Sequence, residues 1–291
     1  MNLIKRIIIS ILVFLFLIEI SLRIIGFGNP IIYENNVQNF YPKENQNSKR
    51  YKNANIKINH LGMRTNFSWE NYKQKEKILF FGDSVTYGGS YIDNKDLFSE
   101  KICTDYLINS ICGNFGVNGY QFENIQSRIK QINEKYYDQI IILTSNVTNS
   151  GKSNFNDFPF YEKYDYSLLK ATTEVFNHFL FKYKIYDAFH SNSLKKNKLK
   201  KNKLKKNSAN FIDELSKYKK VKIFILPTLE DLNNQNKKSK ILELQNFKSN
   251  NPINLYDFII KKNYKDLYFN NAHLNKKGHE YIAKIIYNFV K

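Results

Sequence analysis

A serine that follows a short apolar segment and a glycine is the first feature of this sequence that could do chemistry. The segment Ile78 to Phe81 predicts a buried strand that ends at Gly82, and Ser84 stands two positions further on. A serine at this place projects its hydroxyl from the carboxyl edge of a sheet, where open α/β folds bind ligands. With a base and backbone N–H groups nearby, such a hydroxyl can act as a nucleophile. The ordinary alternative is a turn or a helix N-cap, for which serine is a preferred residue.

Three later segments could supply partners for Ser84. Gly119 follows a short strand-like stretch, Asn146 follows the apolar run Ile140 to Leu143, and His273 precedes an amphipathic segment. A glycine N–H and an asparagine amide can donate hydrogen bonds to an oxyanion, and an imidazole can act as a general base. Together these residues supply the groups that an acyl-transfer site requires.

The order and spacing of these residues resemble the SGNH, or GDSL-type, family of serine esterases. The resemblance covers roughly residues 56 to 290 and is carried by GDSVTYG at 82–88, NFGVNG at 114–119, TSNV at 144–147 and NNAHLNKKGH at 270–279. It implies that Ser84 is the nucleophile and His273 the base, and that the N–H groups of Ser84 and Gly119 form an oxyanion hole with the Asn146 side chain. It also implies a three-layer α/β/α sandwich with a mainly parallel, flavodoxin-like sheet.

The third member of the catalytic triad departs from the family pattern. The departures are Thr144, Val147 and Asn270, which stand where the family carries a Gly, a structural Asp and the catalytic Asp. An asparagine can accept a hydrogen bond from the imidazole, but it carries no charge and therefore stabilises a protonated base less than an aspartate does. Three interpretations stay open: Asn270 is a working substitute, Asp266 or Asp257 orients His273 instead, or the site has lost catalysis and only binds.

Residues 1–27 predict a membrane anchor or an uncleaved signal sequence. Lys5 and Arg6 precede an apolar stretch, and the 19 residues from Ile7 to Ile25 reach the length of a spanning helix. The basic residues favour a cytoplasmic amino terminus, and the resembling family contains many proteins with such an anchor and an exported domain. We therefore expect a single-pass protein of the cell membrane whose catalytic domain faces the periplasm or the cell exterior. A cleaved signal peptide and a core helix are the alternatives.

The rest of the chain is long enough for one large α/β domain. Residues 28–55 are polar and predict a strand-poor linker that wraps onto the domain, and residues 56–291 predict the SGNH-like domain. An insertion at 150–208 interrupts this domain, and its aromatic first part is either a lid over the active-site edge or a separate hydrophobic cluster. Its second part, LKKNKLKKNKLKKN at 194–207, predicts a solvated lysine-rich loop.

Apolar strand patterns alternate with helix patterns along the domain, which indicates a parallel sheet covered on both faces. The predicted strands are Lys77–Phe81, Ile111–Phe115, Gln139–Leu143, Val221–Pro227 and Ile253–Phe258. The predicted helices are Leu97–Ser110, Phe122–Tyr136, Asn210–Lys219, Lys238–Lys248 and Lys276–Val290.

The chain carries a net charge of +19, which points to acidic partners. No nucleic-acid-binding motif accompanies the charge, so we expect no nucleic acid partner. Attraction to anionic lipid headgroups or acidic glycans fits an exported protein better, and biased coding is the alternative explanation of the lysine content. The oligomeric state stays open.

The sequence gives little information about cofactors and disulfides. No Cys-x-x-Cys, HExxH or P-loop pattern appears, so neither a metal nor a nucleotide cofactor is expected. Cys103 and Cys112 are the two cysteines of the chain, and they either form a disulfide or remain buried thiols.

These observations predict an SGNH-like serine esterase or acyl (acetyl) transferase that acts on ester groups of cell-envelope glycans or lipids. Ser84 would carry the acyl group, and the activity would be reduced because Asn270 replaces the usual Asp. Hydrolysis and transfer share this acyl-enzyme, so the motifs do not separate them. The alternative is a catalytically impaired SGNH scaffold that serves as a membrane-anchored glycan-binding module.

Overall fold

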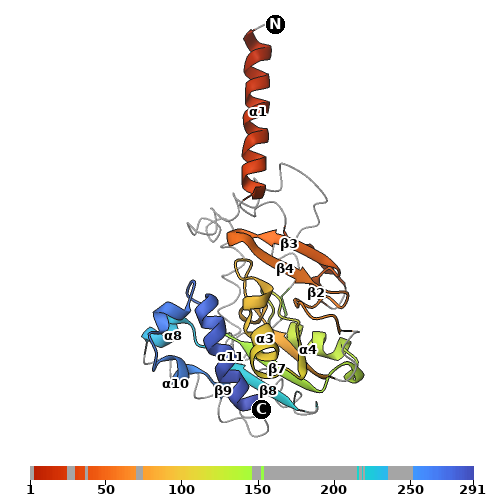
Figure 1. Cartoon of the computed structure of the whole chain (residues 1–291), viewed down its shortest axis with the longest axis vertical. Coiled ribbons are helices and arrows are strands. Elements are labelled where there is room, and N and C mark those ends of the chain that lie inside the picture. The colour runs from red at the N-terminus through yellow and green to blue at the C-terminus, as the bar shows by residue number, and fades with distance from the viewer. Residues whose placement is uncertain are drawn as a thin grey trace, which may run out of the picture.

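A five-stranded parallel sheet forms the centre of the protein (Figure 1). The computed structural model describes residues 3–24, 30–36, 39–69, 75–145, 152–153, 215, 218, 220–234 and 252–291. The strands of the sheet are β5 (Glu76–Gly82), β6 (Ser110–Asn114), β7 (Gln139–Thr144), β8 (Val221–Ile225) and β9 (Ile253–Asn254). They lie in the order β6-β5-β7-β8-β9, and every neighbouring pair is parallel. The predicted α/β class with a parallel sheet is therefore confirmed.

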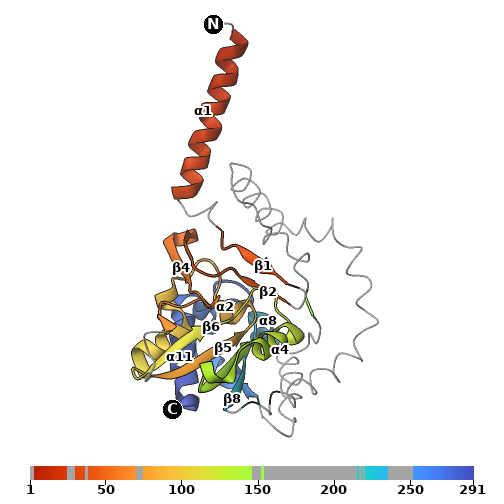
Figure 2. The ribbon, with the colours of Figure 1, turned by 90° about the vertical axis from the view of Figure 1, so that its right-hand side faces the viewer.

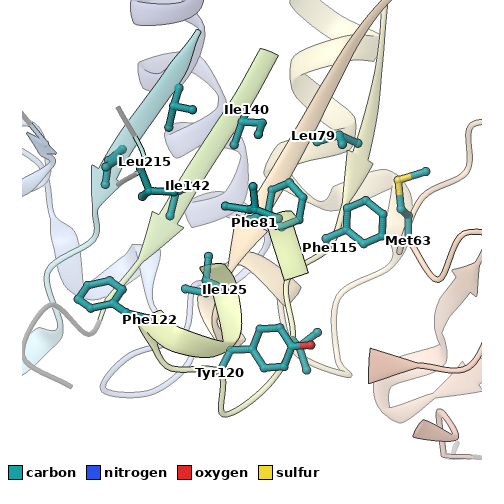
Figure 3. Packing of buried hydrophobic residues seen from close by; sticks show 14 of the residues in the cluster. Met63, Leu79, Phe81, Phe115, Tyr120, Phe122, Ile125, Ile140, Ile142 and Leu215 are labelled. Carbon is teal, nitrogen blue, oxygen red and sulfur yellow. The ribbon is translucent and has the colours of Figure 1, made fainter. Parts of the chain in front are cut away.

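Helices cover both faces of this sheet, and for this reason its strands are apolar almost without interruption. The helices that the structure describes in this domain are α2 (Ser84–Tyr87), α3 (Phe98–Lys101), α4 (Phe122–Gln131), α8 (Leu229–Asn233), α10 (Tyr256–Ile259) and α11 (Lys276–Val290). Leu79 and Phe81 of β5 belong to a buried cluster with α4 (Figure 3). Ile78 and Phe80 of the same strand belong to a second cluster with α3 and α11. Successive side chains of β5 therefore bury on opposite faces, as strand geometry requires.

Two predicted helices end earlier than expected, while α11 has the predicted bounds. The predicted helix Leu97–Ser110 is interrupted because α3 passes into a π-helical turn at Ile102–Tyr106 before β6 begins. The predicted helix Phe122–Tyr136 ends at Gln131, and a separate 3-10 turn follows at Glu134–Tyr136.

The last predicted strand, Ile253–Phe258, is shorter than expected. Only Ile253–Asn254 pairs with β8, because the Asn254 side chain accepts a hydrogen bond from Tyr256 N at 2.9 Å and the chain turns into α10. The predicted helix Lys238–Lys248 and most of Asn210–Lys219 lie outside the described residues, as do the lysine-rich loop and nearly all of the insertion.

The segment 28–55 is not the strand-poor linker that its polar composition predicts. It contains the antiparallel pair β1 (Tyr33–Asn35) and β2 (Phe40–Pro42), then β3 (Gln46–Arg50), which pairs with β4 (Ala54–Ile58). The prediction was wrong about the strands because the apolar side chains of the segment occur in short groups, such as Ile31–Tyr33 and Phe40–Tyr41, that polar residues separate. Tyr33 and Phe40 are nevertheless buried in the main core with the sheet residues, and this tertiary contact orders the polar chain around them.

Residues Leu3–Ile24 form a continuous helix, α1, which extends away from the sheet domain (Figure 2). Within the described chain, no helix combines the length and the apolar character that crossing a bilayer requires. The predicted transmembrane helix is therefore not supported. Between Arg6 and Glu19 the run without charged residues has 12 residues, which is about 18 Å of helix, while the hydrocarbon core of a bilayer is about 30 Å thick.

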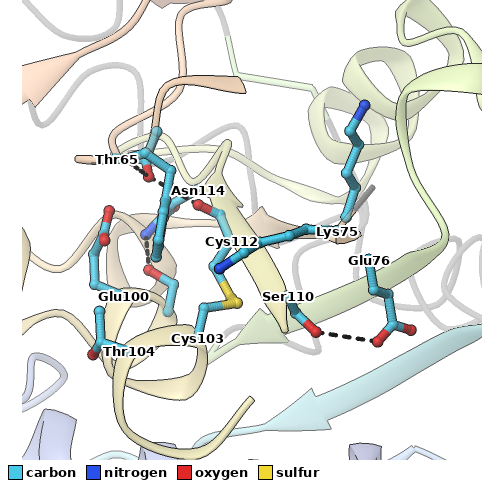
Figure 4. Close-up of a disulfide and its surroundings, with 12 residues drawn as sticks. Thr65, Lys75, Glu76, Glu100, Cys103, Thr104, Ser110, Cys112 and Asn114 are labelled. Carbon is cyan, nitrogen blue, oxygen red and sulfur yellow. Dashed lines mark hydrogen bonds between the residues drawn. A yellow bond between two sulfur atoms is a disulfide. The ribbon is translucent and has the colours of Figure 1, made fainter. Parts of the chain in front are cut away.

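The two cysteines, whose state the sequence left open, form a disulfide (Figure 4). Cys103 lies in the π-helical turn after α3 and Cys112 lies in β6, with their Cα atoms 5.8 Å apart. The bond ties the helical layer to the edge strand of the sheet.

Candidate active site

The end of β5 and the start of α2 place Ser84 at the carboxyl edge of the sheet. Gly82 is the last residue of β5, and a Cβ added there would lie 2.0 Å from Leu143 O, so only glycine fits. Asp83 is the N-cap of α2, and its side chain accepts a hydrogen bond from Val85 N at 2.9 Å. Ser84 therefore begins a short helix on top of the strand and remains half-buried, with its hydroxyl available to a partner.

The partner is His273, which lies 189 residues further along the chain. Ser84 Oγ is 2.8 Å from His273 Nε2. The loop that carries His273 is closed at both ends, because Phe269 N donates to His273 O at 2.8 Å and Tyr268 pairs with Leu274 in an antiparallel bridge. The topology of the sheet and this closed loop thus bring a hydroxyl and an imidazole together.

Asn270 contacts the other nitrogen of the ring. Its Oδ1 is 2.9 Å from His273 Nδ1 and also accepts hydrogen bonds from Ala272 N at 3.1 Å and His273 N at 3.0 Å. Turning the amide over would set its NH₂ group against these two backbone donors. The oxygen therefore has to face the ring, which assigns the proton to Nδ1 and leaves Nε2 to accept from the Ser84 hydroxyl.

The two carboxylates considered as substitutes for Asn270 do not take its place. Asp266 accepts a hydrogen bond from Asn263 Nδ2 at 2.8 Å, and Asp257 belongs to the first turn of α10. Among the described residues, neither carboxylate is hydrogen-bonded to His273.

Asp83, a buried carboxylate with no role in the predicted site, lies next to the nucleophile. Its Oδ2 accepts from Thr144 Oγ1 at 2.8 Å, from Ser145 N at 3.1 Å and from Ser145 Oγ at 3.3 Å, in addition to the Val85 N–H on Oδ1. All four contacts are donors, which is the pattern of an ionised carboxylate.

Asp83 and His273 influence each other's ionisation. Burial raises the pKa of Asp83, while hydrogen bonds and the charge on His273 act in the opposite direction. Burial lowers the pKa of His273, and Asp83 partly offsets this by raising it. Asp83 is thus a carboxylate whose charge acts on the imidazole, although it is not hydrogen-bonded to the ring. Its place in the tripeptide Gly-Asp-Ser was the signal that could have revealed it.

The segment after β6 brings Gly119 to the same edge of the sheet. Asn114 Nδ2 donates to Thr86 O at 2.7 Å, and Val117 N donates to Gly82 O at 3.2 Å, so the segment runs along the start of α2. Gly119 follows in a turn with φ +79°, a conformation that favours glycine. Its N–H and that of Ser84 donate to no other described residue, which leaves both available to a ligand. Asn146 lies outside the described residues.

A buried arginine, which the sequence did not distinguish from an exposed one, fixes the loop after α2. Arg64 donates to Tyr87 O at 2.8 Å, Gly89 O at 2.7 Å and Asn94 Oδ1 at 3.0 Å, and also to Ile92 O. Its side chain is 1% exposed, so each of these acceptors replaces water. Arg64 therefore fixes the segment 87–94, which follows the short helix that begins at Ser84.

Neither a metal site nor a second catalytic histidine is evident around this edge. In the ranges that the structure describes, no group of three or more His, Cys, Asp or Glu side chains could hold a metal ion. His279 in α11 accepts from Phe98 N at 3.3 Å, and burial lowers its pKa to about 3. This histidine is neutral near pH 7 and packs inside the domain.

Comparisons with known proteins find structural similarity but no sequence relative. No protein-family profile matches the chain, and no curated protein sequence matches it. A lipolytic protein of the G-D-S-L family from Veillonella parvula is 13% identical at a TM-score of 0.43, with 72% of this chain and 94% of that chain covered. A lipase/acylhydrolase from Enterococcus faecalis is 15% identical at a TM-score of 0.44, covering 74% of this chain and 97% of that one.

An acetylxylan esterase from Geobacillus stearothermophilus is 14% identical at a TM-score of 0.42, covering 75% of this chain and 95% of that one. The similar solved structures thus include a member of the family that the four sequence blocks resemble. Identities and TM-scores at this level do not transfer an activity, so the chemistry has to follow from the site itself.

Proposed function

We propose that this protein is a serine ester hydrolase of the SGNH type that works through a relay of Ser84, His273 and Asn270. The observation that carries the proposal is the unbroken chain from Ser84 Oγ to His273 Nε2 at 2.8 Å and from His273 Nδ1 to Asn270 Oδ1 at 2.9 Å. This chain lies at the carboxyl end of β5, where parallel sheets bind their ligands.

In the acylation step, the Ser84 oxygen attacks the ester carbonyl carbon while His273 Nε2 takes the hydroxyl proton. The carbonyl electrons move onto oxygen, and the N–H groups of Ser84 and Gly119, with the Asn146 amide, stabilise the resulting oxyanion. The oxyanion collapses, the bond to the alcohol breaks, and His273 returns the proton to the leaving oxygen. The product is an acyl group on Ser84 and a free alcohol.

In the deacylation step, water attacks the acyl carbon and gives a proton to His273. The second oxyanion collapses, the bond to Ser84 Oγ breaks, and His273 reprotonates the serine. A sugar hydroxyl in place of water would give acyl transfer by the same steps. The Nδ1–H of His273 stays hydrogen-bonded to Asn270 Oδ1 throughout, so the ring keeps its orientation while its charge changes.

We also propose that the enzyme works outside the reducing cytoplasm, on acylated glycans or lipids of the cell envelope. The disulfide between Cys103 and Cys112 supports the location, because structural disulfides persist in oxidising compartments. The net charge of +19 favours negatively charged surfaces such as those of the envelope.

The proposal can be tested with the full chain, a fluorophosphonate probe and p-nitrophenyl acetate. The wild type should be labelled and should hydrolyse the ester, and Ser84→Ala should lose labelling and about 10³-fold or more of the turnover. His273→Ala should lose a similar factor. Ser68→Ala removes an exposed serine outside the site and should behave as the wild type does.

A wild type that is never labelled and that hydrolyses the ester no faster than Ser84→Ala would overturn the proposal. The glycan-binding module without catalysis would then be the better description of the fold.

A further inference from the structure

A cavity of about 720 Å³ lies beside the loop that carries Asn270 and His273. Three segments line it: the turn 52–54 between β3 and β4, the loop 91–96 that follows α2, and residues between 265 and 277 that flank the two relay residues. Its volume is within the range of about 300–1,000 Å³ that is typical of small-molecule sites.

Direct contacts join this cavity to the catalytic loop. The ring of Tyr91 stacks on that of Phe269 with centroids 4.0 Å apart, and both side chains line the cavity. Tyr91 donates its hydroxyl to Leu274 O at 3.0 Å, and Phe269 N donates to His273 O at 2.8 Å. A ligand in the cavity therefore lies against the segment that holds His273.

The lining carries five lysines and three aspartates, a net charge of +2. Each aspartate is already engaged: Asp93 accepts from Asn55 Nδ2 at 3.0 Å, Asp96 pairs with Lys276 at 3.0 Å, and Asp266 accepts from Asn263. Within the described residues, the lining lysines that form no ion pair are Lys95, Lys265 and Lys277. The cavity thus presents more positive charge than its own carboxylates balance.

Two of the lysines stand where an α-helix disfavours positive charge. Lys276 and Lys277 are the first two residues of α11, whose first turn contains no acidic residue. The amino end of a helix carries partial positive charge, so acidic side chains or bound anions stabilise it and lysines do not. Local rules are broken in this way chiefly where a function requires it.

From the cavity, its contacts and its charge, we infer a subsite for an anionic saccharide, a sugar chain bearing carboxylate or phosphate groups. The inference rests on the proposed function and deepens it, because the sugar bound here would belong to the acylated glycan whose ester Ser84 attacks. The lysines would contact the acidic groups, and the ring of Phe269 helps to place one of them, because Lys52 Nζ lies 4.7 Å from the centroid of that ring.

The lining favours a saccharide over the acyl chain of a lipid. Eight of its fourteen residues are charged, and the side chains that could contact a hydrocarbon chain are Ala54, Tyr91, Ile92 and Phe269. A lipid tail needs a continuous apolar channel, since burying it against charged groups desolvates them without compensation.

The test measures binding separately from catalysis, using the full chain with Ser84→Ala. Calorimetry with trigalacturonic acid should show binding that weakens with added salt, and neutral xylotriose should bind at least about tenfold more weakly. Reversing two charges in the lining, Lys265→Glu with Lys277→Glu, should weaken trigalacturonate binding about tenfold or more. The pair Lys265→Arg with Lys277→Arg keeps the charge and should keep the affinity, which separates charge from folding.

The control variant is Lys284→Glu, an exposed lysine of the same helix that does not line the cavity. It changes the net charge without touching the subsite and should bind as the parent does. Equal affinity for xylotriose, equal affinity for inorganic phosphate alone, or binding only to anionic phospholipid vesicles would overturn the subsite.

The two proposals fail in distinguishable ways. Loss of saccharide binding in the double glutamate variant, together with an unlabelled Ser84 in the wild type, would support the subsite and reject the hydrolase. A labelled Ser84 without any trigalacturonate binding would reject the subsite alone.

Discussion

The substitution Asn270→Asp changes the charge of the third relay member and little else. Oδ1 of Asn270 accepts three hydrogen bonds, from Ala272 N, His273 N and His273 Nδ1, at 2.9 to 3.1 Å. A carboxylate has the same shape as the amide and can accept the same three bonds with one oxygen. The substitution therefore adds a negative charge beside a ring that becomes positive in the proposed transition state.

The size of the effect follows from the distance and from the exposure of the side chain. Two unit charges about 4 Å apart interact by about 4 kcal/mol at an effective dielectric constant of 20. Residue 270 is exposed, so water screens the new charge and a gain of about 1.5–3 kcal/mol is more appropriate. At 1.36 kcal/mol for each factor of ten, turnover should rise about 10- to 100-fold. The reverse exchange in a serine protease, where the aspartate is buried, costs about 10⁴.

The assay is kcat/KM for p-nitrophenyl acetate between pH 4.5 and 9, for the wild type, Asn270→Asp and Asn270→Ala. Burial lowers the pKa of His273 in the wild type, so its acid limb should lie below the ordinary histidine value of about 6.5. The new carboxylate favours the protonated ring, so the acid limb should move to higher pH by about one to two units. Asn270→Ala removes the acceptor and should lower the rate.

An Asn270→Asp variant with an unchanged or lower rate and an unmoved acid limb would refute this reasoning. Such a result would mean that a charge at position 270 does not change the pKa of His273. The contact between residue 270 and Nδ1 would then not determine the protonation of the ring.

Three further predictions concern charge, burial and covalent structure. Asp83→Asn should lower kcat/KM about tenfold and move its acid limb to lower pH, because Asp83 raises the pKa of His273 and the amide does not. A purely structural role would leave the limb in place. Burial raises the pKa of Glu100 from the ordinary value of 4.5 to about 7, so the contribution of Glu100 to stability is complete below pH 4.5 and is lost as pH rises through 7. Urea unfolding of Glu100→Gln should therefore show up to about 3 kcal/mol more stability than the wild type at pH 8 and little difference at pH 4.5; equal pH dependence in both would contradict the prediction. Replacing Cys103 and Cys112 by serine opens a loop of sequence separation 9 and should lower the unfolding free energy by about 2.5 kcal/mol, whereas an unchanged urea midpoint would show that the bond contributes nothing to stability.

The sheet could be predicted from the sequence because its strands are buried on both faces and read as continuous apolar runs. β7, for example, is apolar from Ile140 to Leu143, and each of these residues is fully buried. The boundaries of α11 were equally clear, since Asn275 caps its amino end by accepting from Gly278 N at 3.0 Å. The hairpin of β1 and β2 could not be predicted, because Tyr33 and Phe40 are ordered by contacts with distant residues and not by a local pattern.

In the candidate site too, some features could be predicted from the sequence, whereas others depend on contacts that form only in the folded chain. The types and order of the relay residues could be recognised in the sequence, but the orientation of the Asn270 amide could not be predicted from it. That orientation is imposed by the N–H groups of Ala272 and His273, whose directions depend on the closed loop before α11. The role of Arg64 was hidden for a related reason, because its four acceptors lie between positions 87 and 94 and come within reach only in the folded chain.

The absence of an aspartate at position 270 does not by itself identify a site that has lost its chemistry. A catalytic aspartate does two things: it fixes the tautomer of the histidine and it compensates the positive charge of the protonated ring. In the proposed mechanism two residues divide these tasks. Asn270 fixes the tautomer through its Oδ1, which two backbone N–H groups hold in place, and Asp83 supplies negative charge from its position just after β5. Asp83 acts without a hydrogen bond to the ring, so it compensates less of the charge than a carboxylate in contact would. The division therefore predicts a slower enzyme with intact geometry, and the opposite shifts of the acid limb in Asn270→Asp and Asp83→Asn are its signature.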